Sequence, residues 1–157
     1  YCIKLPLCKY NYVFFHMNID QLKCVIESLF SKLIYTVQLR GNASEEVLEL
    51  LLKMDVLFEG EIRKALKMCV YMQITKIIRK TDMLCIYKFY NTRSHFTTIT
   101  SDMFQFCSCE RHLILTLDSK TFGYCVHLLL IKLKEIVDLK IESVEIVDED
   151  FDKILYS

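Results

Sequence analysis

The stretch QITKIIRKTDMLCIYKFYNTRSHFTTIT, residues 73–100, decides the fold class. It consists of short runs rich in β-branched and aromatic residues, with turn-forming residues between them at 80–82 and 91–94. Runs of this kind, separated by turn signals, predict consecutive strands of an antiparallel meander. The strands expected here and just beyond this stretch are 73–79, 83–90, 95–100 and 103–106.

Helical patterns lie on both sides of this meander. Apolar residues recur at spacings of three and four from Asp20 to Gly41, which predicts a first amphipathic helix. Asn42 and Glu45 resemble a capping box that opens a second helix, and a third is expected over 61–72. Past the meander we expect a strand at 113–117, a helix at 125–139 and a short acidic helix at the end, within 143–155 and capped at Asp148. The predicted fold class is therefore α+β.

The composition points to one folded domain. The chain has 157 residues, 53% of them apolar, and its 20 Lys and Arg balance 20 Asp and Glu to a net charge of zero. High hydrophobicity and low net charge exclude a disordered chain. A strongly basic balance is missing as well, so a role with nucleic acid must rest on a local patch or on a partner. The three glycines lie too far apart for a glycine-rich phosphate loop.

The beginning of the chain is harder to assign. Residues 1–16 have no usable periodicity, and the patterned region begins at Met17. One interpretation is that Met17 is the natural start and that 1–16 are a non-native extension; the other is a short apolar strand. We favour the first, with one domain over 17–157. The pattern predicts neither a signal peptide nor a membrane span.

Eight cysteines are many for a chain without a recognisable secretory signal, and a disulfide framework is the weaker explanation. Cys24, Cys69 and Cys85 each stand alone in an apolar segment. A cysteine in such a place usually behaves as a small buried hydrophobe. We therefore expect these three in the core.

Two short motifs carry the chemistry, C-x-C at Cys107 and Cys109 and C-x-H at Cys125 and His127. Three thiolates and one imidazole form a ligand set that closes a tetrahedral zinc site and leaves no position for a substrate. At a strand end, side chains i and i+2 project to one side and can hold one ion. At a helix start, the helix dipole favours the negative charge of a three-thiolate site.

These motifs predict a zinc finger at about 103–139 with ββα topology, in which the strand at 113–117 forms one arm of a hairpin. His112 is a spare candidate ligand, although its isolated position favours exposure to solvent. The alternative is that the cysteines are free and buried beside an ordinary core histidine.

The order C-x-C then C-x-H resembles the SWIM zinc finger, and residues 17–157 resemble the small SWIM-domain subunit of the Shu recombination complex. The resemblance includes the segment LLKMDVLFEG at 51–60 before a helix with Ala65 and Leu66, then the meander, the finger and the acidic tail. Two segments depart from the family. Glu110-Arg111-His112 stands where Pro-Ala-Phe is frequent, and Val126 stands where Lys is frequent, so the ligands are kept but the surface of the finger differs.

The resemblance implies a nuclear, non-catalytic subunit with one structural Zn²⁺. It would pair with a RecA-like ATPase paralogue and support recombinase filaments on single-stranded DNA in homologous recombination and double-strand break repair. It implies no membrane and no small-molecule substrate.

Two surfaces are candidates for these contacts. One is the apolar side of the first helix, with the candidate partner residues Leu22, Ile26, Leu29, Phe30 and Leu33. An apolar stripe at helical spacing is more often core than interface. The other is a local excess of cations over 61–93, with the candidate DNA-binding residues Arg79, Lys80 and Lys88 and the aromatic residues Tyr87, Tyr90 and Phe96 nearby. Charge with stacking suits single-stranded DNA, and a solvated charged face is the alternative.

Three rival functions belong to other classes. A SWIM finger also occurs in ubiquitin-transfer and transposon proteins, although no second zinc module is visible in this chain. A thiol-redox protein would use Cys107 and Cys109 and would hold no metal. An enzyme with His127 as its base lacks a nucleophile or carboxylate at a useful spacing.

Overall fold

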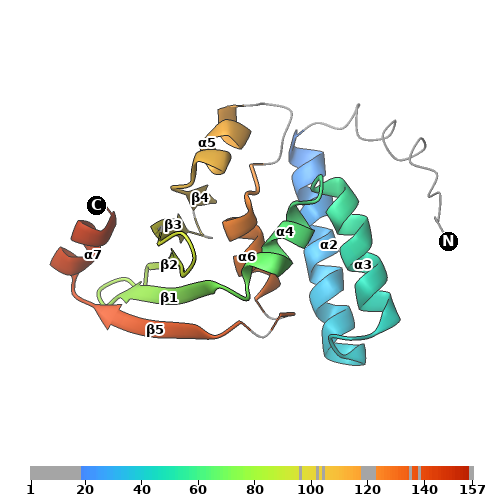
Figure 1. Ribbon diagram of the computed structural model, residues 1–157, viewed down its shortest axis with the longest axis horizontal. Helices are drawn as coiled ribbons and strands as arrows, with labels where there is room; N and C mark the ends of the chain where they lie inside the picture. Colours follow the sequence, from blue (N-terminus) through green and yellow to red (C-terminus); the bar gives the residue numbers. More distant parts are fainter. Residues whose placement is uncertain are drawn as a thin grey trace.

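A computed structural model describes residues 19–95, 97–101, 103, 105–117, 123–134, 136–137 and 139–155 (Figure 1). The predicted α+β class is confirmed. In chain order the elements are α2 (Ile19–Arg40), α3 (Glu45–Leu57), α4 (Glu61–Met68), β1 (Met72–Arg79), β2 (Cys85–Asn91), β3 (Thr97–Ser101), β4 (Phe106–Cys107), α5 (Glu110–Leu117), α6 (Val126–Leu133), β5 (Ile141–Ile146) and α7 (Asp148–Leu155). Residues 1–16, assigned above to an extension, lie outside the described ranges.

The sheet has the strand order β4-β3-β2-β1-β5. The first four strands in this order form the predicted antiparallel meander, in which Ile77 of β1 lies opposite Ile86 of β2. The fifth strand was not predicted. β5 pairs with β1 in parallel, with Ile74 opposite Ile141, so the sheet is mixed. The acidic tail helix predicted within 143–155 is thus correct only from Asp148 onward.

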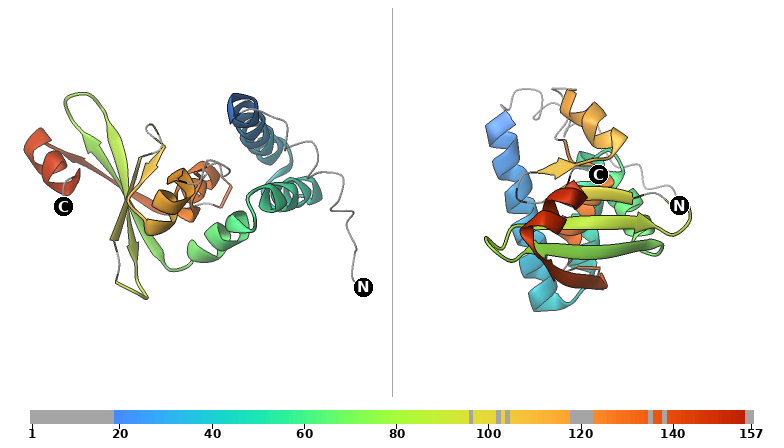
Figure 2. Two further views of the ribbon diagram at one scale, coloured as in Figure 1. Left: turned by 90° about the horizontal axis from the view of Figure 1, so that it is seen from above. Right: turned by 90° about the vertical axis from the view of Figure 1, so that its left-hand side faces the viewer.

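The two faces of the sheet carry different helices, as the edge-on view in Figure 2 shows. On one face, Ile74, Tyr87 and Phe89 join the main core with α6 and with residues from α2, α3 and α4. On the other face, Phe151 of α7 packs on Ile77 and Ile86 in a small separate cluster. The main core therefore lies between the sheet and the helices, and β4 and α6 meet at its edge.

The segment between the two Cys/His motifs differs from its prediction. The expected strand at 113–117 is wrong, because these residues belong to the helix α5, whose first turn carries Glu110. A short apolar run of this kind has no period that separates a strand from a helix. The hairpin arm of the predicted ββα finger is therefore replaced by a helix. The helix predicted at 125–139 is also shorter and ends at Leu133.

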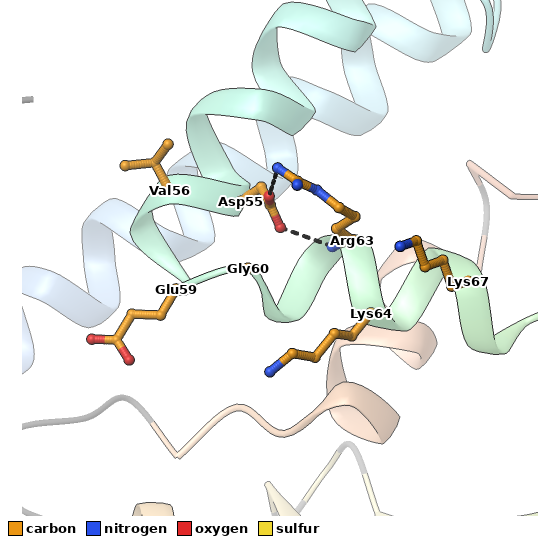
Figure 3. A pocket seen from close by; sticks show the side chains of 7 residues that line it. All are labelled: Asp55, Val56, Glu59, Gly60, Arg63, Lys64 and Lys67. Carbon is orange, nitrogen blue, oxygen red and sulfur yellow. Dashed lines mark hydrogen bonds and ion pairs between the residues drawn. The ribbon is translucent and has the colours of Figure 1, made fainter. Parts of the chain in front are cut away.

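Side-chain acceptors hold the start of α3 and the corner between α3 and α4. Ser44, rather than the predicted Asn42, caps α3 and accepts a hydrogen bond from the Val47 N–H at 3.4 Å. Buried Asp55 accepts hydrogen bonds from the backbone N–H and the guanidinium of Arg63, both at 2.8 Å. Figure 3 shows these bonds beside an open hollow that Lys64 and Lys67 also line.

The three isolated cysteines are less buried than predicted. Cys24 is exposed on α2, and Cys69 and Cys85 are partly buried against the main core. The core prediction is wrong for Cys24, because α2 buries Ile26, Phe30 and Leu33 and leaves this side chain exposed to solvent. Across the described ranges, every helix is too short or too polar to cross a membrane.

Candidate metal centre

The two motifs come together at the edge of the main core. The sulfur atoms of Cys107, Cys109 and Cys125 and a ring nitrogen of His127 all lie within 4.8 Å of one another. Four ligand atoms this close can surround a single ion, because thiolate and imidazole ligands stand about 2.0 to 2.3 Å from zinc in such sites. The predicted ligands thus form a cluster that can hold a metal ion.

The backbone at the end of β4 positions the first pair of ligands, Cys107 and Cys109. Cys107 ends β4 opposite Thr100 of β3, and Cys109 lies just before α5. Ser108 between them is held in place by two bonds to Ile99, since its N–H donates to the Ile99 carbonyl and its hydroxyl accepts from the Ile99 N–H, each at 2.9 Å. The expectation that C-x-C stands at a strand end is confirmed.

The second pair stands at the start of α6. Cys125 is the N-cap residue, with extended backbone, and His127 lies in the first turn. Placement at a helix N-terminus brings the positive end of the helix dipole to the sulfur of Cys125. The expectation that C-x-H opens a helix is therefore confirmed as well.

The cluster is largely buried. Cys107 is 2% exposed, Cys125 is 0% exposed and His127 is 8% exposed, while Cys109 is partly exposed. The ring of Phe89 meets the His127 ring edge-on, with centroids 5.1 Å apart. A bound ion would have an apolar wall on the side of the core, and Cys109 would face outward.

Three of the four groups, Cys109, Cys125 and His127, have strongly shifted pKa values. Hydrogen bonds from the Cys107 and Cys125 thiols hold the pKa of Cys109 far below its usual value. The corresponding bonds with Cys107 and Cys109 raise the pKa of Cys125. Burial alone would lower the pKa of His127, but hydrogen bonds with Cys107 and Cys109 raise it to about 9. These shifts favour a thiolate at Cys109 beside an imidazolium at His127, and metal binding would release the protons that the other ligands carry.

Two further donors support the sulfur atoms. The Thr100 hydroxyl donates to Cys107 Sγ at 3.2 Å, and the backbone N–H of His112 donates to Cys109 Sγ at 3.3 Å. Outer hydrogen bonds of this kind orient metal ligands and tune their affinity. The role of Thr100 was not found from the sequence, because it depends on the pairing of β3 with β4.

His112 is not one of the four clustered residues, and it is not exposed as expected. Its side chain is buried, and its Nδ1 lies 2.8 Å from the carbonyl oxygen of Gly123. The ring also stands edge-on to Phe106. This nitrogen is therefore engaged with the backbone and is not available as a ligand.

The candidate DNA-binding residues are not part of the cluster: Arg79 ends β1, Lys80 follows it in the turn, and Lys88 lies on β2. Arg79 donates two hydrogen bonds to Asp82, at 2.9 and 2.6 Å, and its guanidinium lies over the Phe151 ring. Lys80 and Lys88 are exposed. Of the aromatic residues named with them, Tyr87 is buried in the main core, and Phe96 lies outside the described ranges.

The cations of 61–93 do not form one strip. Lys88 lies opposite Thr75 and Lys76 lies opposite Tyr87, so these two lysines belong to opposite faces of the sheet. Three others stand on α4, where Arg63 pairs with Asp55 and Lys64 pairs with Glu61. The charge excess read from the sequence is thus distributed over several surfaces.

Four of the five candidate partner residues, Ile26, Leu29, Phe30 and Leu33, belong to the main core or pack against it. Ile26, Phe30 and Leu33 are buried in the main core, and Leu29 packs against it. The side chain of Leu22 lies outside the described part of the chain. As folded, the three buried residues offer a partner no exposed surface, in keeping with the alternative that this stripe is core.

Comparisons with known proteins give no relative: no family model, no curated protein and no solved structure matches the chain.

Proposed function

We propose that the protein is a non-catalytic, zinc-binding subunit of a Shu-type complex that supports recombinase filament assembly on single-stranded DNA during homologous recombination. The observation that carries the proposal is the buried cluster of Cys107, Cys109, Cys125 and His127. Its chain order, C-x-C then C-x-H, resembles the SWIM finger. A Cys₃His set is typical of structural zinc sites.

The position of the cluster favours a structural role for the ion. The four ligands join the end of β4 to the start of α6, and two of their sulfur atoms are fully or nearly buried. A site with four protein ligands has no open position for a substrate or a reactive water. The ion would therefore stabilise the fold and take no part in a reaction.

The partner in this proposal is a RecA-like ATPase paralogue in the nucleus. The zero net charge of the chain supports a division of labour in which the partner supplies nucleotide binding and most of the DNA contact. The subunit would act through protein contacts, without a membrane or a small-molecule substrate.

The metal is tested first. Zinc content is measured on the full chain purified under reducing conditions, and the expected value is one ion per chain. Cys109→Ser combined with His127→Ala should abolish it, whereas Cys24→Ser, which changes an exposed cysteine outside the cluster, should not. Chelation should lower the melting temperature, because apparent zinc binding in small fingers is on the order of 10 kcal/mol. A stoichiometry near zero rejects the site.

The complex is tested second. The chain is co-expressed with a RecA-like ATPase paralogue, and we expect a stable heterodimer that accelerates recombinase loading on single-stranded DNA. The double ligand variant should lose both properties, and Cys24→Ser should keep them. A zinc-loaded chain that neither binds the ATPase nor affects loading rejects the Shu-type role and favours a SWIM-type adaptor in ubiquitin transfer or another assembly.

A thiol-redox function is the second candidate, because Cys109 has a lowered pKa and is partly exposed. Both features are typical of reactive cysteines. This candidate predicts a metal-free chain in which Cys107 and Cys109 cycle between thiols and a disulfide. Metal analysis and thiol counting on the same sample separate the two functions.

A further inference from the structure

His112 lies between the two halves of the Cys/His cluster. It belongs to α5, directly after the first ligand pair, and its backbone N–H donates to Cys109 Sγ at 3.3 Å. Its ring reaches the segment just before the second pair, where Nδ1 stands 2.8 Å from the carbonyl oxygen of Gly123. One residue thus contacts the chain on both sides of the site.

The chemistry of this contact is fixed by its acceptor. A carbonyl oxygen can only accept, so His112 Nδ1 must carry the hydrogen and donate it. The ring is 7% exposed and stands edge-on to Phe106, with centroids 6.2 Å apart. Burial strengthens such a bond, since water competes for it less.

Gly123 has a backbone conformation that suits this contact. Its φ of +66° lies in the left-handed region, which glycine adopts without strain. A Cβ at this position would stand 3.6 Å from the Thr116 side chain of α5, so the backbone runs close to that helix. Cys125, the N-cap residue of α6, follows two residues later. The Gly123 carbonyl is therefore close in sequence to the second ligand pair.

We infer that His112 is a positioning residue whose bond to Gly123, called the clasp below, holds the two ligand pairs together and slows release of the metal. The inference rests on the proposed metal site. Because Cys107 and Cys109 belong to one segment and Cys125 and His127 to another, an ion can leave once the segments separate. The bond from His112 to Gly123 opposes this separation whether or not the ion is present. It therefore also organises the ligands before metal enters.

The test compares replacements that differ in one hydrogen bond. In His112→Asn the side-chain amide nitrogen can occupy the place of Nδ1 and donate to Gly123. In His112→Gln the amide stands one carbon farther out, near the place of Nε2, and His112→Leu has no donor. The control is His95→Leu, which removes an exposed histidine in the turn between β2 and β3.

Zinc release is followed on each full-length chain with a chelating indicator, after circular dichroism has shown the native helix content. We expect release about 10 to 100 times faster for His112→Leu and His112→Gln, because the loss of affinity typical for an outer-shell partner would appear in the dissociation rate. Release from His112→Asn should stay near the wild-type rate, as should release from His95→Leu. Nitrogen-15 shifts of the wild-type ring should show hydrogen on Nδ1.

The outcomes separate the inference from the proposed site. A wild-type chain without metal overturns the site and the clasp with it. A wild-type chain with zinc whose release is unchanged in His112→Leu and His112→Gln overturns only the clasp. If His112→Asn releases zinc as fast as His112→Gln, ring packing and not the hydrogen bond holds the site, and the inference is also overturned. The comparison of His112→Asn with His112→Gln still tests the hydrogen bond if the His112→Leu variant does not fold.

Discussion

At the residue scale, Thr100 supports Cys107, one of the buried ligands of the Cys/His cluster. Its side chain is fully buried, and its hydroxyl donates to Cys107 Sγ. Thr100→Val keeps the shape and the strand preference but removes this donor. We expect the free energy of unfolding to fall by about 1 kcal/mol and metal affinity to fall several-fold, as for loss of one buried hydrogen bond. Cobalt(II) substitution, monitored through its thiolate charge-transfer band, measures the affinity.

A matched control for this change lies two residues earlier on β3. Thr98 is also buried, and it faces the same side of the strand. Thr98→Val should leave cobalt affinity at the wild-type value. Equal losses in the two variants would assign the effect to the strand as a whole and not to the bond with the sulfur.

The bond between Arg79 and Asp82 predicts a dependence of stability on pH. The hydrogen bond from Arg79 lowers the pKa of Asp82 from 3.8 to about 2. A carboxyl with a lowered pKa contributes stability that is fully present above its unfolded value and is lost as the pH falls through the folded value. The stability advantage of the wild type over Asp82→Asn should therefore be constant above about pH 4 and shrink between pH 4 and pH 2.

Urea unfolding of both chains at pH 7, 4 and 3 measures this difference, and carbon-13 shifts of the Asp82 carboxyl follow its ionisation directly. A titration midpoint at the ordinary value of 3.8 would contradict the prediction. It would also mean that the two hydrogen bonds to Asp82 do not hold Arg79 in solution.

The four ligands were predictable from the sequence, whereas their supporting contacts were not. Cys107 with Cys109, and Cys125 with His127, are each two residues apart, so local geometry alone brings each pair together. The contacts of Thr100 and Gly123 depend on strand register and on the path of a loop. Neither the strand register nor the path of the loop can be read from the spacing of residues in the sequence.

At the scale of elements, local periodicity predicted the helices before the sheet and the antiparallel meander. It failed at α5 and β5 for different reasons. The run 113–117 has helical backbone, and its mixture of leucines with Ile114 and Thr116 suits a helix as well as a strand. Leu113 and Ile114 are exposed. The β5 sequence, IESVEI, contains two glutamates and is mostly exposed, so its strand character comes from pairing with a distant strand.

The corner between α3 and α4 predicts a graded effect on stability. Asp55→Ala removes both the N-terminal cap of α4 and the ion pair with Arg63. We expect a loss of about 2 kcal/mol in the free energy of unfolding, close to the upper range for a cap, because Asp55 is buried. Chemical denaturation measures this loss.

Asp55→Asn is the comparison at the same position. The amide oxygen can still accept the Arg63 N–H, and only the charge is lost, so this variant should lie between the wild type and Asp55→Ala. If Asn is as damaging as Ala, the ion pair and not the cap fixes this corner.

At the scale of the whole molecule, dispersed positive charge predicts weak DNA binding by the isolated chain. The cations lie on α4 and on both faces of the sheet, and α7 places acidic residues beside one of these faces. Tight binding requires many simultaneous phosphate contacts. We expect affinity for single-stranded DNA to rise when the proposed heterodimer forms and to fall several-fold in Lys80→Glu with Lys88→Glu.

Fluorescence anisotropy of a labelled oligonucleotide at several salt concentrations measures both effects. The matched control is Lys67→Glu with Lys64→Glu, which changes the same charge on α4. Equal affinity for the isolated chain and the complex would contradict the division of labour proposed above. An unchanged affinity in the Lys80 and Lys88 variant would make these lysines an ordinary solvated surface.

The parallel pairing of β1 with β5 has a consequence for the chain as it leaves the ribosome. The meander can form once β2, β3 and β4 have emerged, but the other edge of β1 stays open until residues 141–146 are synthesised. An open strand edge is a template for pairing with another chain. The isoleucine-rich β1 is therefore exposed to pairing with another chain until β5 emerges, and β5, with its two glutamates, then covers that edge.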